Sequence, residues 1–183
     1  VPSGKNYGLQ VGSGGRLGFT SGGLEGASLT PVAPGGLSGG DLTVRGEIRA
    51  HGGIHVSHAD VAERFEVTGD YSMGDALIAD PNAPGKLTVS TRPRDPAFAG
   101  VASSKPGLTL GSEINGPPVG IAGRVWAKAS AENGPVRPGT PLTTAGTPGH
   151  LMAADAKTPA AAIVGIYLGV LESGTGLVEV LLK

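Results

Sequence analysis

The 183-residue sequence contains no cysteine and only seven aromatic residues, namely one Trp, three Tyr and three Phe. The absence of cysteine excludes a disulfide framework, a zinc knuckle and thiol chemistry. The sequence also has no large excess of either charge, because it contains 14 Lys and Arg and 15 Asp and Glu, which gives a net charge of −1. A general nucleic-acid-binding protein carries a clustered basic surface, so this balance argues against that function.

Long hydrophobic runs are absent as well. The most apolar stretch, residues 163–182, is interrupted by Glu172, Glu179 and a Ser-Gly-Thr-Gly turn. A membrane-spanning helix needs about 20 consecutive apolar residues. We therefore expect strands here and no membrane insertion. The first residues, Val-Pro-Ser-Gly, lack the basic and apolar regions of a signal peptide.

Catalytic signatures are missing too. Pro84-Gly85-Lys86 lacks the earlier glycine of a phosphate loop, and Gly12-Ser13-Gly14 continues without the third glycine of a dinucleotide fingerprint. No Gly-x-Ser-x-Gly elbow occurs. We therefore expect no cofactor, and we expect a protein that is not an enzyme.

Glycine is abundant, and its distribution is uneven. Residues 1–57 hold 16 of the 33 glycines, with only sparse apolar residues between them. Such a segment cannot offset the ordering cost of about 1–2 kcal/mol per residue by itself. It is either a flexible linker or a fibre shaft that is ordered by identical copies of itself.

An alternating pattern favours the shaft. From Asp41 to Arg49, and again after Gly53, apolar residues share one parity and charged residues the other, which is typical of a half-buried strand. Little apolar sequence nearby is left to cover the apolar face, so its partner is the later domain or, as we favour, a neighbouring chain. The interface residues predicted from this pattern are Leu42, Val44, Ile48, Ile54 and Val56.

Short apolar runs separated by Pro-Gly and Asn-Gly turns fill the chain from Ala59 onward. Short strands at close spacing predict a β-barrel or a sandwich. Only residues 60–64 and 153–162 have the pattern of a helical turn. The segment that starts at Met73 and the one that starts at Arg137 both place a glycine turn before an apolar strand and a Pro-Gly turn after it. This repeated pattern indicates either a duplicated hairpin or an arrangement that is common in β-barrels.

The order of these motifs resembles the C-terminal β domain of phage tail-fibre, neck-appendage and contractile-injection-system fibre proteins. More distantly, it resembles the auto-cleaving intramolecular chaperone domains of such fibres. The resemblance covers roughly residues 59–183, and the preceding segment is similar to a fibre shaft in composition only. The motifs that carry it are Asp60-Val61-Ala62-Glu63-Arg64-Phe65-Glu66-Val67, Gly74-Asp75-Ala76-Leu77, Ala99-Gly100-Val101-Ala102-Ser103, Ile121-Ala122-Gly123-Arg124-Val125, Glu132-Asn133-Gly134-Pro135-Val136-Arg137-Pro138-Gly139, Thr147-Pro148-Gly149-His150-Leu151-Met152 and Leu171-Glu172-Ser173-Gly174-Thr175-Gly176.

The resemblance implies a homotrimer whose C-terminal domain nucleates or caps the shaft. It also implies an upstream fibre or baseplate protein as a partner and a location in a virion or an extracellular injection particle. Packing physics agrees, because a glycine-rich segment with one thin apolar face becomes stable only when copies pack together.

Four histidines invite a metal hypothesis. His51, His55 and His58 are closely spaced, but on a strand the first two share the outward face and His58 falls on the inner one. In a trimer, three copies of His58 would ring the axis and could hold an ion. The alternative is that these histidines are ordinary surface or interface residues.

Two polar clusters are candidates for chemistry. Asp60, Glu63 and Glu66 lie close together in the sequence. On a helical turn, Asp60 and Glu63 would share a face and could act as an acid/base pair, but we favour a helix cap or an interchain ion pair with Arg64 as the explanation. Ser103-Ser104-Lys105 could serve as nucleophile and base for self-cleavage. The alternative is a polar turn, which we favour because adjacent residues rarely point at one another.

Two aromatic residues, Trp126 and Tyr167, lie in apolar runs, and we expect both in the core rather than on a ligand platform. The sequence thus predicts an all-β protein, with a trimeric shaft over residues 1–58 and a β-barrel-like head over 59–183. Its expected function is that of a structural phage-type fibre that attaches to a cell-surface glycan or protein receptor. The alternatives are an autoproteolytic chaperone and a carbohydrate-binding or depolymerising tip.

Overall fold

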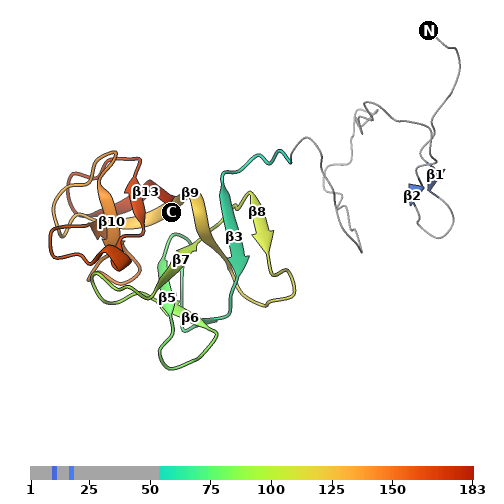
Figure 1. Ribbon diagram of the computed structural model, residues 1–183, viewed down its shortest axis with the longest axis horizontal. Coiled ribbons are helices and arrows are strands. Elements are labelled where there is room, and N and C mark those ends of the chain that lie inside the picture. Colours follow the sequence, from blue (N-terminus) through green and yellow to red (C-terminus); the bar gives the residue numbers. More distant parts are fainter. Residues whose placement is uncertain (1–9, 12–16, 19–53) are drawn as a thin grey trace, which may run out of the picture. The chain divides into compact units, whose positions relative to one another are not determined.

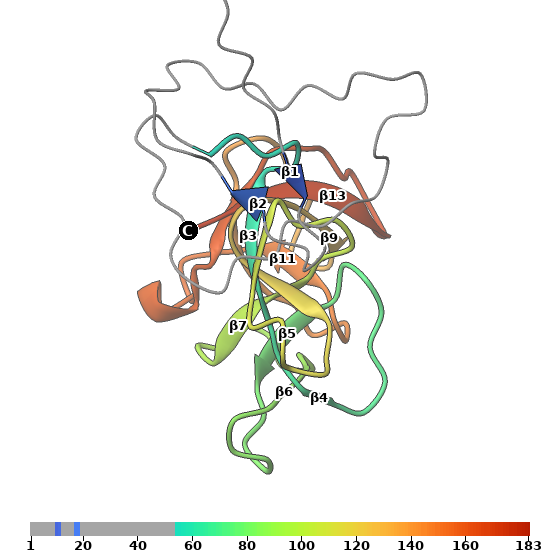
Figure 2. The same cartoon turned by 90° about the vertical axis from the view of Figure 1, so that its right-hand side faces the viewer.

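The computed structural model describes residues 10–11, 17–18 and 54–183. The chain divides into two units, Val1–Ala50 and His51–Lys183, and each is described by itself. In the first unit, β1 (Gln10–Val11) and β2 (Leu17–Gly18) pair antiparallel. All the other described elements lie in the second unit (Figures 1 and 2).

Five strand positions close a first barrel. Its strands are β3 (Asp60–Arg64) with its continuation β4 (Val67–Thr68), β5 (Ala76–Ala79), β6 (Leu87–Val89), β7 (Phe98–Ala102) and the first half of β9 (Pro118–Ser130). Pairing runs in the order β4–β6–β5–β7–β9–β3. Because β3 and β4 follow one another along the chain, this ring is closed. The short strand β8 (Leu108–Leu110) pairs in parallel with β3, outside the ring.

A second closed ring follows. It consists of the second half of β9, β10 (Pro141–Thr144), β11 (Leu151–Ala153), β12 (Gly165–Tyr167) and β13 (Thr175–Leu182). Pairing runs β9–β11–β10–β12–β13 and returns to β9. A single 3₁₀ turn, η1 (Ala160–Ala162), precedes β12. Figure 1 shows the long strand β9 passing from one barrel to the other.

The two barrels are structural repeats with the same strand register. Leu77 pairs with Val89 on one side and Gly100 on the other. Leu142, 65 residues later, pairs in the same way with Ala153 and with Gly165, which follows Gly100 by the same 65 residues. The glycine turns before β5 and β10 also match, since Gly74 and Gly139 both have φ of 88°. The repeated pattern expected from the sequence is therefore present in the structure and extends to the whole barrel, while the choice between a duplicated hairpin and a common barrel arrangement stays a prediction.

The cores repeat residue by residue. Eight core positions of the first barrel have register equivalents in the core of the second. The pairs are Phe65 and Ala127, Val67 and Ala129, Leu77 and Leu142, Leu87 and Leu151, Val89 and Ala153, Ala99 and Val164, Ala102 and Tyr167, and Val119 and Val180. Each barrel thus encloses its own apolar core, which is the ordinary source of stability for a small closed barrel.

Short contacts fix one barrel against the other. The Ala76 N–H donates to the Gly149 carbonyl, and the Lys128 N–H donates to the Gly74 carbonyl, both at 2.8 Å. The Lys128 ammonium also lies 2.7 Å from a carboxylate oxygen of Asp75, which is 8% exposed. Because these bonds join residues of different barrels, they hold the two barrels in a defined arrangement.

Several sequence expectations meet the structure here. The all-β class and the barrel-like head are confirmed for the described residues. The helical turn over 60–64 is wrong, because this segment pairs with β8 and β9 as strand β3. The turn expected within 153–162 is present as η1. No helix in the described part of the chain is long and apolar enough to cross a membrane.

Two further expectations concern the N-terminal side. Leu42, Val44 and Ile48 lie outside the described residues, as does most of the expected shaft. Ile54 and Val56 are described and belong to no strand, and their side chains are 71% and 51% exposed. Whether they form an interface between chains stays a prediction.

Candidate functional site

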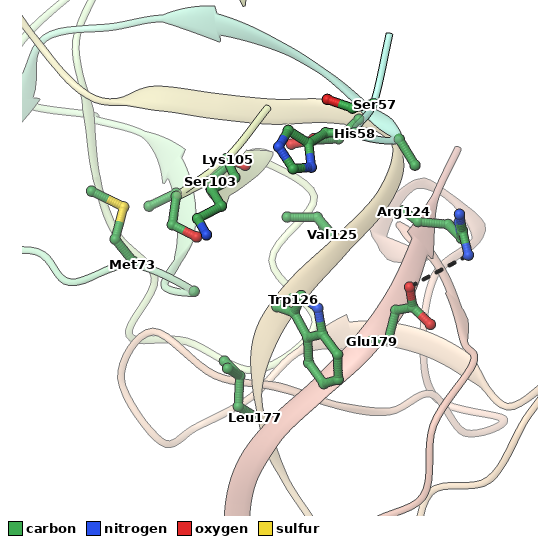
Figure 3. A pocket seen from close by; sticks show the side chains of 15 residues that line it. Ser57, His58, Met73, Ser103, Lys105, Arg124, Val125, Trp126, Leu177 and Glu179 are labelled. Atoms are coloured by element: carbon green, nitrogen blue, oxygen red, sulfur yellow. Dashed lines mark ion pairs between the residues drawn. The ribbon is translucent and has the colours of Figure 1, made fainter. Parts of the chain in front are cut away.

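A cleft of about 310 Å³ opens where the two barrels meet (Figure 3). Its walls come from four places in the chain besides β13. These are the segment 57–60 that leads into β3, the turn 73–74 before β5, residues 102–105 at and after the end of β7, and the middle of β9. Its volume lies at the lower end of the range for small-molecule sites, which are about 300–1,000 Å³.

Trp126 forms the aromatic wall of this cleft. Along β9, Val125 and Ala127 point into the second barrel and are at most 5% exposed, so Trp126 between them points outward. Its side chain is 56% exposed. The expectation that Trp126 lies in the core is therefore wrong. The sequence did carry a signal, because Trp126 shares its parity with Arg124 and Lys128, whose charged ends need solvent.

Two aliphatic side chains extend the apolar surface beside the indole. Met73, in the turn before β5, is 45% exposed, and Leu177 on β13 is 57% exposed. Figure 3 shows Leu177 on one side of the Trp126 ring and the Arg124–Glu179 pair on the other. The cleft thus combines an apolar floor with a charged side.

The charged side of the cleft has acids that are already engaged. Glu179 lies across from Trp126 in the β9–β13 pairing, and its carboxylate is 3.7 Å from the Arg124 guanidinium. Asp60 is 4% exposed, and its Oδ1 accepts the Gly107 N–H at 3.2 Å. Its Oδ2 is buried without a hydrogen-bond partner in the described structure. Lys105 is exposed and makes no ion pair within the described residues.

The histidine candidates are only partly placed. His58 is exposed and lines the cleft, and His55 is exposed nearby in the chain, while His51 lies outside the described residues. The part of the chain that the structure describes contains no group of three or more metal-ligating side chains. A ring of three His58 copies would need other chains, so it stays a prediction.

The other polar candidates are only partly brought together. Ser103 is 4% exposed, and it lines the cleft with Lys105. Glu66 does not join Asp60, because its carboxylate lies 2.6 Å from the Lys86 ammonium and raises the pKa of that lysine. Arg64 donates to the Gly116 carbonyl at 2.6 Å and makes no ion pair within the described residues, so its interchain ion pair stays a prediction. The helix-based acid/base pair of Asp60 and Glu63 is wrong, because residues 60–64 form strand β3 and not a helical turn.

Tyr167 is in the core, as expected. It is fully buried in the second barrel, and its hydroxyl oxygen has no hydrogen-bond partner in the described structure. Burial raises the pKa of this hydroxyl well above its ordinary value. The residue therefore acts as a packing group and takes no part in the cleft.

Comparison with known proteins places the fold. No family model matches the chain, and no curated protein matches it. Among solved structures, the chain is similar to the crystal structure of the pre-mature bacteriophage phi29 gene product 12, with a TM-score of 0.56 and 16% sequence identity. The similarity covers 77% of this chain and 24% of that one, so the chain spans about a quarter of the phage protein's length. The chain therefore shares its fold with a portion of a bacteriophage protein.

Proposed function

We propose that this chain is the distal part of a homotrimeric fibre of a phage or a related injection particle, which attaches the particle to a cell surface. The fold shared with a bacteriophage gene product supports the structural class. The balanced charge and the lack of a recognisable catalytic motif fit a structural role. The upstream partner is then another fibre or baseplate protein, and the location is the particle itself.

The observation that carries trimerisation is an uncovered apolar patch where the glycine-rich segment enters the head. Ile54 and Val56 are 71% and 51% exposed, and Leu108 and Leu110 on β8 are 48% and 44% exposed. Strand β8 starts beside the segment that follows Ile54 and Val56, because Gly107, the residue before Leu108, lies against the His58 backbone. We call these four side chains the entry patch.

Strand β8 adds a second reason for a partner. Among the described strands it pairs only with β3, so one of its edges carries unpaired backbone groups. A monomer that exposes apolar side chains along an open strand edge is prone to associate. Burial of the entry patch by identical copies would contribute about 25 cal/mol for each Å² of apolar surface removed from water.

A pair of variants tests this assignment. Leu108→Glu with Leu110→Glu places two charges in the entry patch and should convert a trimer into a monomer. The matched control is Ile163→Glu with Val170→Glu, because these side chains are 45% and 56% exposed on the second barrel. Light scattering behind gel filtration should show monomers for the first variant only. Equal assembly of both variants would contradict the assignment of the interface.

We propose that the chain is a structural protein and not an enzyme. The alternative of a self-cleaving chaperone is the simplest to test. Intact-mass spectrometry after prolonged incubation of the purified protein should give one mass of about 18.0 kDa. Two fragments whose masses add up to the whole would favour the chaperone, and Ser103→Ala would then show whether the cleft residue takes part.

A further inference from the structure

The second barrel does not require a tryptophan at position 126. By strand register, the equivalent position in the first barrel is Arg64, since Arg64 pairs with Pro118 on β9 as Trp126 pairs with Glu179 on β13. An arginine at this outward position is accommodated through its bond to the Gly116 carbonyl. The fold thus tolerates a polar side chain there, whereas Trp126 exposes more than half of a large aromatic surface. A role outside the barrel explains this residue better than packing.

The surroundings of Trp126 match the chemistry of sugar recognition. An exposed indole offers a flat apolar face with a polar N–H, and the faces of sugar rings that carry C–H groups pack against such surfaces. Hydroxyl groups of Ser57 and Ser104 also line the cleft and can hydrogen-bond to sugar hydroxyls. A site of about 310 Å³ accommodates one or two sugar rings.

The charge of the cleft selects among sugars. Two acids and two cations line it, and one of each is paired, because the Glu179 carboxylate lies 3.7 Å from the Arg124 guanidinium. Asp60 is 4% exposed and its Oδ1 accepts the Gly107 N–H, whereas Lys105 is exposed and makes no ion pair in the described part of the chain. An accessible, unpaired cation in a cleft with an aromatic face favours a ligand that carries a carboxylate, because charge-assisted hydrogen bonds are the strongest polar contacts available there.

We infer that the cleft between the barrels binds an acidic sugar of a surface glycan, of the uronic or sialic type. The sugar ring stacks on Trp126, and its carboxylate meets Lys105. The inference rests on the proposed attachment function and names the chemical class of its receptor. One such site binds weakly, and three copies on a trimer raise the overall avidity when the glycan repeats.

The single tryptophan makes the binding test direct. Trp126 is the only tryptophan in the chain, so its fluorescence reports on the cleft alone. The 183-residue protein is titrated with 3′-sialyllactose and with digalacturonate, and with lactose and digalactose as the matched neutral probes. We expect at least one acidic probe to change the emission in a saturable way, and to bind about tenfold more tightly than its neutral counterpart.

Variants separate the two parts of the site, with binding measured by calorimetry. Trp126→Ala should abolish measurable binding of the acidic probe while leaving the unfolding midpoint within a few degrees. Lys105→Gln should remove most of the preference for the acidic over the neutral sugar. Lys157→Gln is the matched control, because Lys157 is also exposed but does not line the cleft. Equal losses for Lys105→Gln and Lys157→Gln would overturn the assignment of the carboxylate site.

Quenching of Trp126 fluorescence by iodide and the solution mass show whether a negative result contradicts the sugar site or the trimeric fibre. Iodide that quenches Trp126 while neither acidic probe binds overturns the sugar site. Iodide that cannot reach Trp126 in the assembled protein also overturns it, because another copy then covers the cleft. If the protein is a monomer that binds the acidic probe, the proposal of a trimeric fibre is contradicted and the sugar site is supported. If the protein is a trimer whose cleft is open but binds neither acidic probe, the sugar site is contradicted and the trimeric fibre is supported.

Discussion

Ala102 and Tyr167 hold equivalent positions in the two barrels, although one is among the smallest core side chains and the other is the largest that is fully buried. Ala102 pairs with Val119 on β9, and Tyr167 pairs with Val180 on β13. A second equivalent pair reverses the sizes, since Phe65 in the first barrel corresponds to Ala127 in the second. Each barrel therefore receives one aromatic ring from these two positions, which keeps the core volume similar.

The first prediction concerns the Tyr167 hydroxyl. Because this buried oxygen lacks a hydrogen-bond partner in the described structure, removing it should cost nothing. Tyr167→Phe should leave the free energy of unfolding unchanged or raise it by up to about 1 kcal/mol. Urea unfolding followed by circular dichroism measures the change. A loss above about 1 kcal/mol would show that the hydroxyl is bonded and would contradict this assignment.

The second prediction tests the exchange of volume between barrels. Tyr167→Ala should lower the stability by about 3–5 kcal/mol, because it leaves a cavity in a closed core. Adding Ala127→Phe recreates the arrangement of the first barrel and should recover part of this loss. Denaturant titrations of both variants and of Ala127→Phe alone give the coupling energy between the sites. The absence of any coupling would contradict the volume exchange.

The third prediction concerns the glycines at the start of the pairings that close the barrels. A Cβ on Gly100 would lie 2.5 Å from the Gly120 carbonyl oxygen, and one on Gly165 would collide with the Leu181 carbonyl oxygen. Alanine at either site should therefore separate β7 from β9 or β12 from β13 and cost several kcal/mol. Gly134 is the control, because a Cβ there meets nothing within 4 Å and alanine costs only the strain of its φ of 96°, about 1–2 kcal/mol.

The fourth prediction concerns the pH dependence of the turn before β11. Glu132 accepts the Gly146 N–H and the Thr147 hydroxyl, each at 2.6 Å, and the Ser130 hydroxyl at 3.0 Å. Burial opposes ionisation, but these hydrogen bonds prevail and hold the pKa of Glu132 below its ordinary value.

A lowered pKa means that Glu132 stabilises the fold above about pH 4.3, the usual value for an unfolded chain, and that this contribution disappears as the pH falls through the folded pKa. Glu132→Gln should therefore be less stable than the parent protein at pH 7, with a smaller difference at pH 3. Urea unfolding at both values measures it. Glu113→Gln, at an exposed site without these contacts, should show no such convergence.

Much of the barrel could be predicted from the sequence, because its strands are short apolar runs that end at glycine or proline turns. The equivalence of Gly74 and Gly139 was visible for the same reason. The identity of β3 was not, since Asp60 to Arg64 fits a capped helical turn locally and becomes a strand only through pairing with residues about 45–60 positions away. Pairings that distant leave no local signal.

The cleft was harder to predict than the fold. Gly123 separates two apolar runs in the sequence, yet β9 continues through it, because glycine with a φ of 92° lets the strand pass the Ala59 carbonyl. This continuity gives Trp126 its outward direction. An aromatic residue in an apolar run indicates a core, and only its shared parity with Arg124 and Lys128 showed otherwise.

The solution mass of the parent protein tests the fibre proposal most directly. Light scattering behind gel filtration distinguishes a chain of 18.0 kDa from a trimer of about 54 kDa. The account predicts the trimer, which should persist on dilution and dissociate into monomers when Leu108 and Leu110 are both replaced by Glu. A stable monomer at every concentration would contradict it, because the entry patch would then have no partner of its own kind.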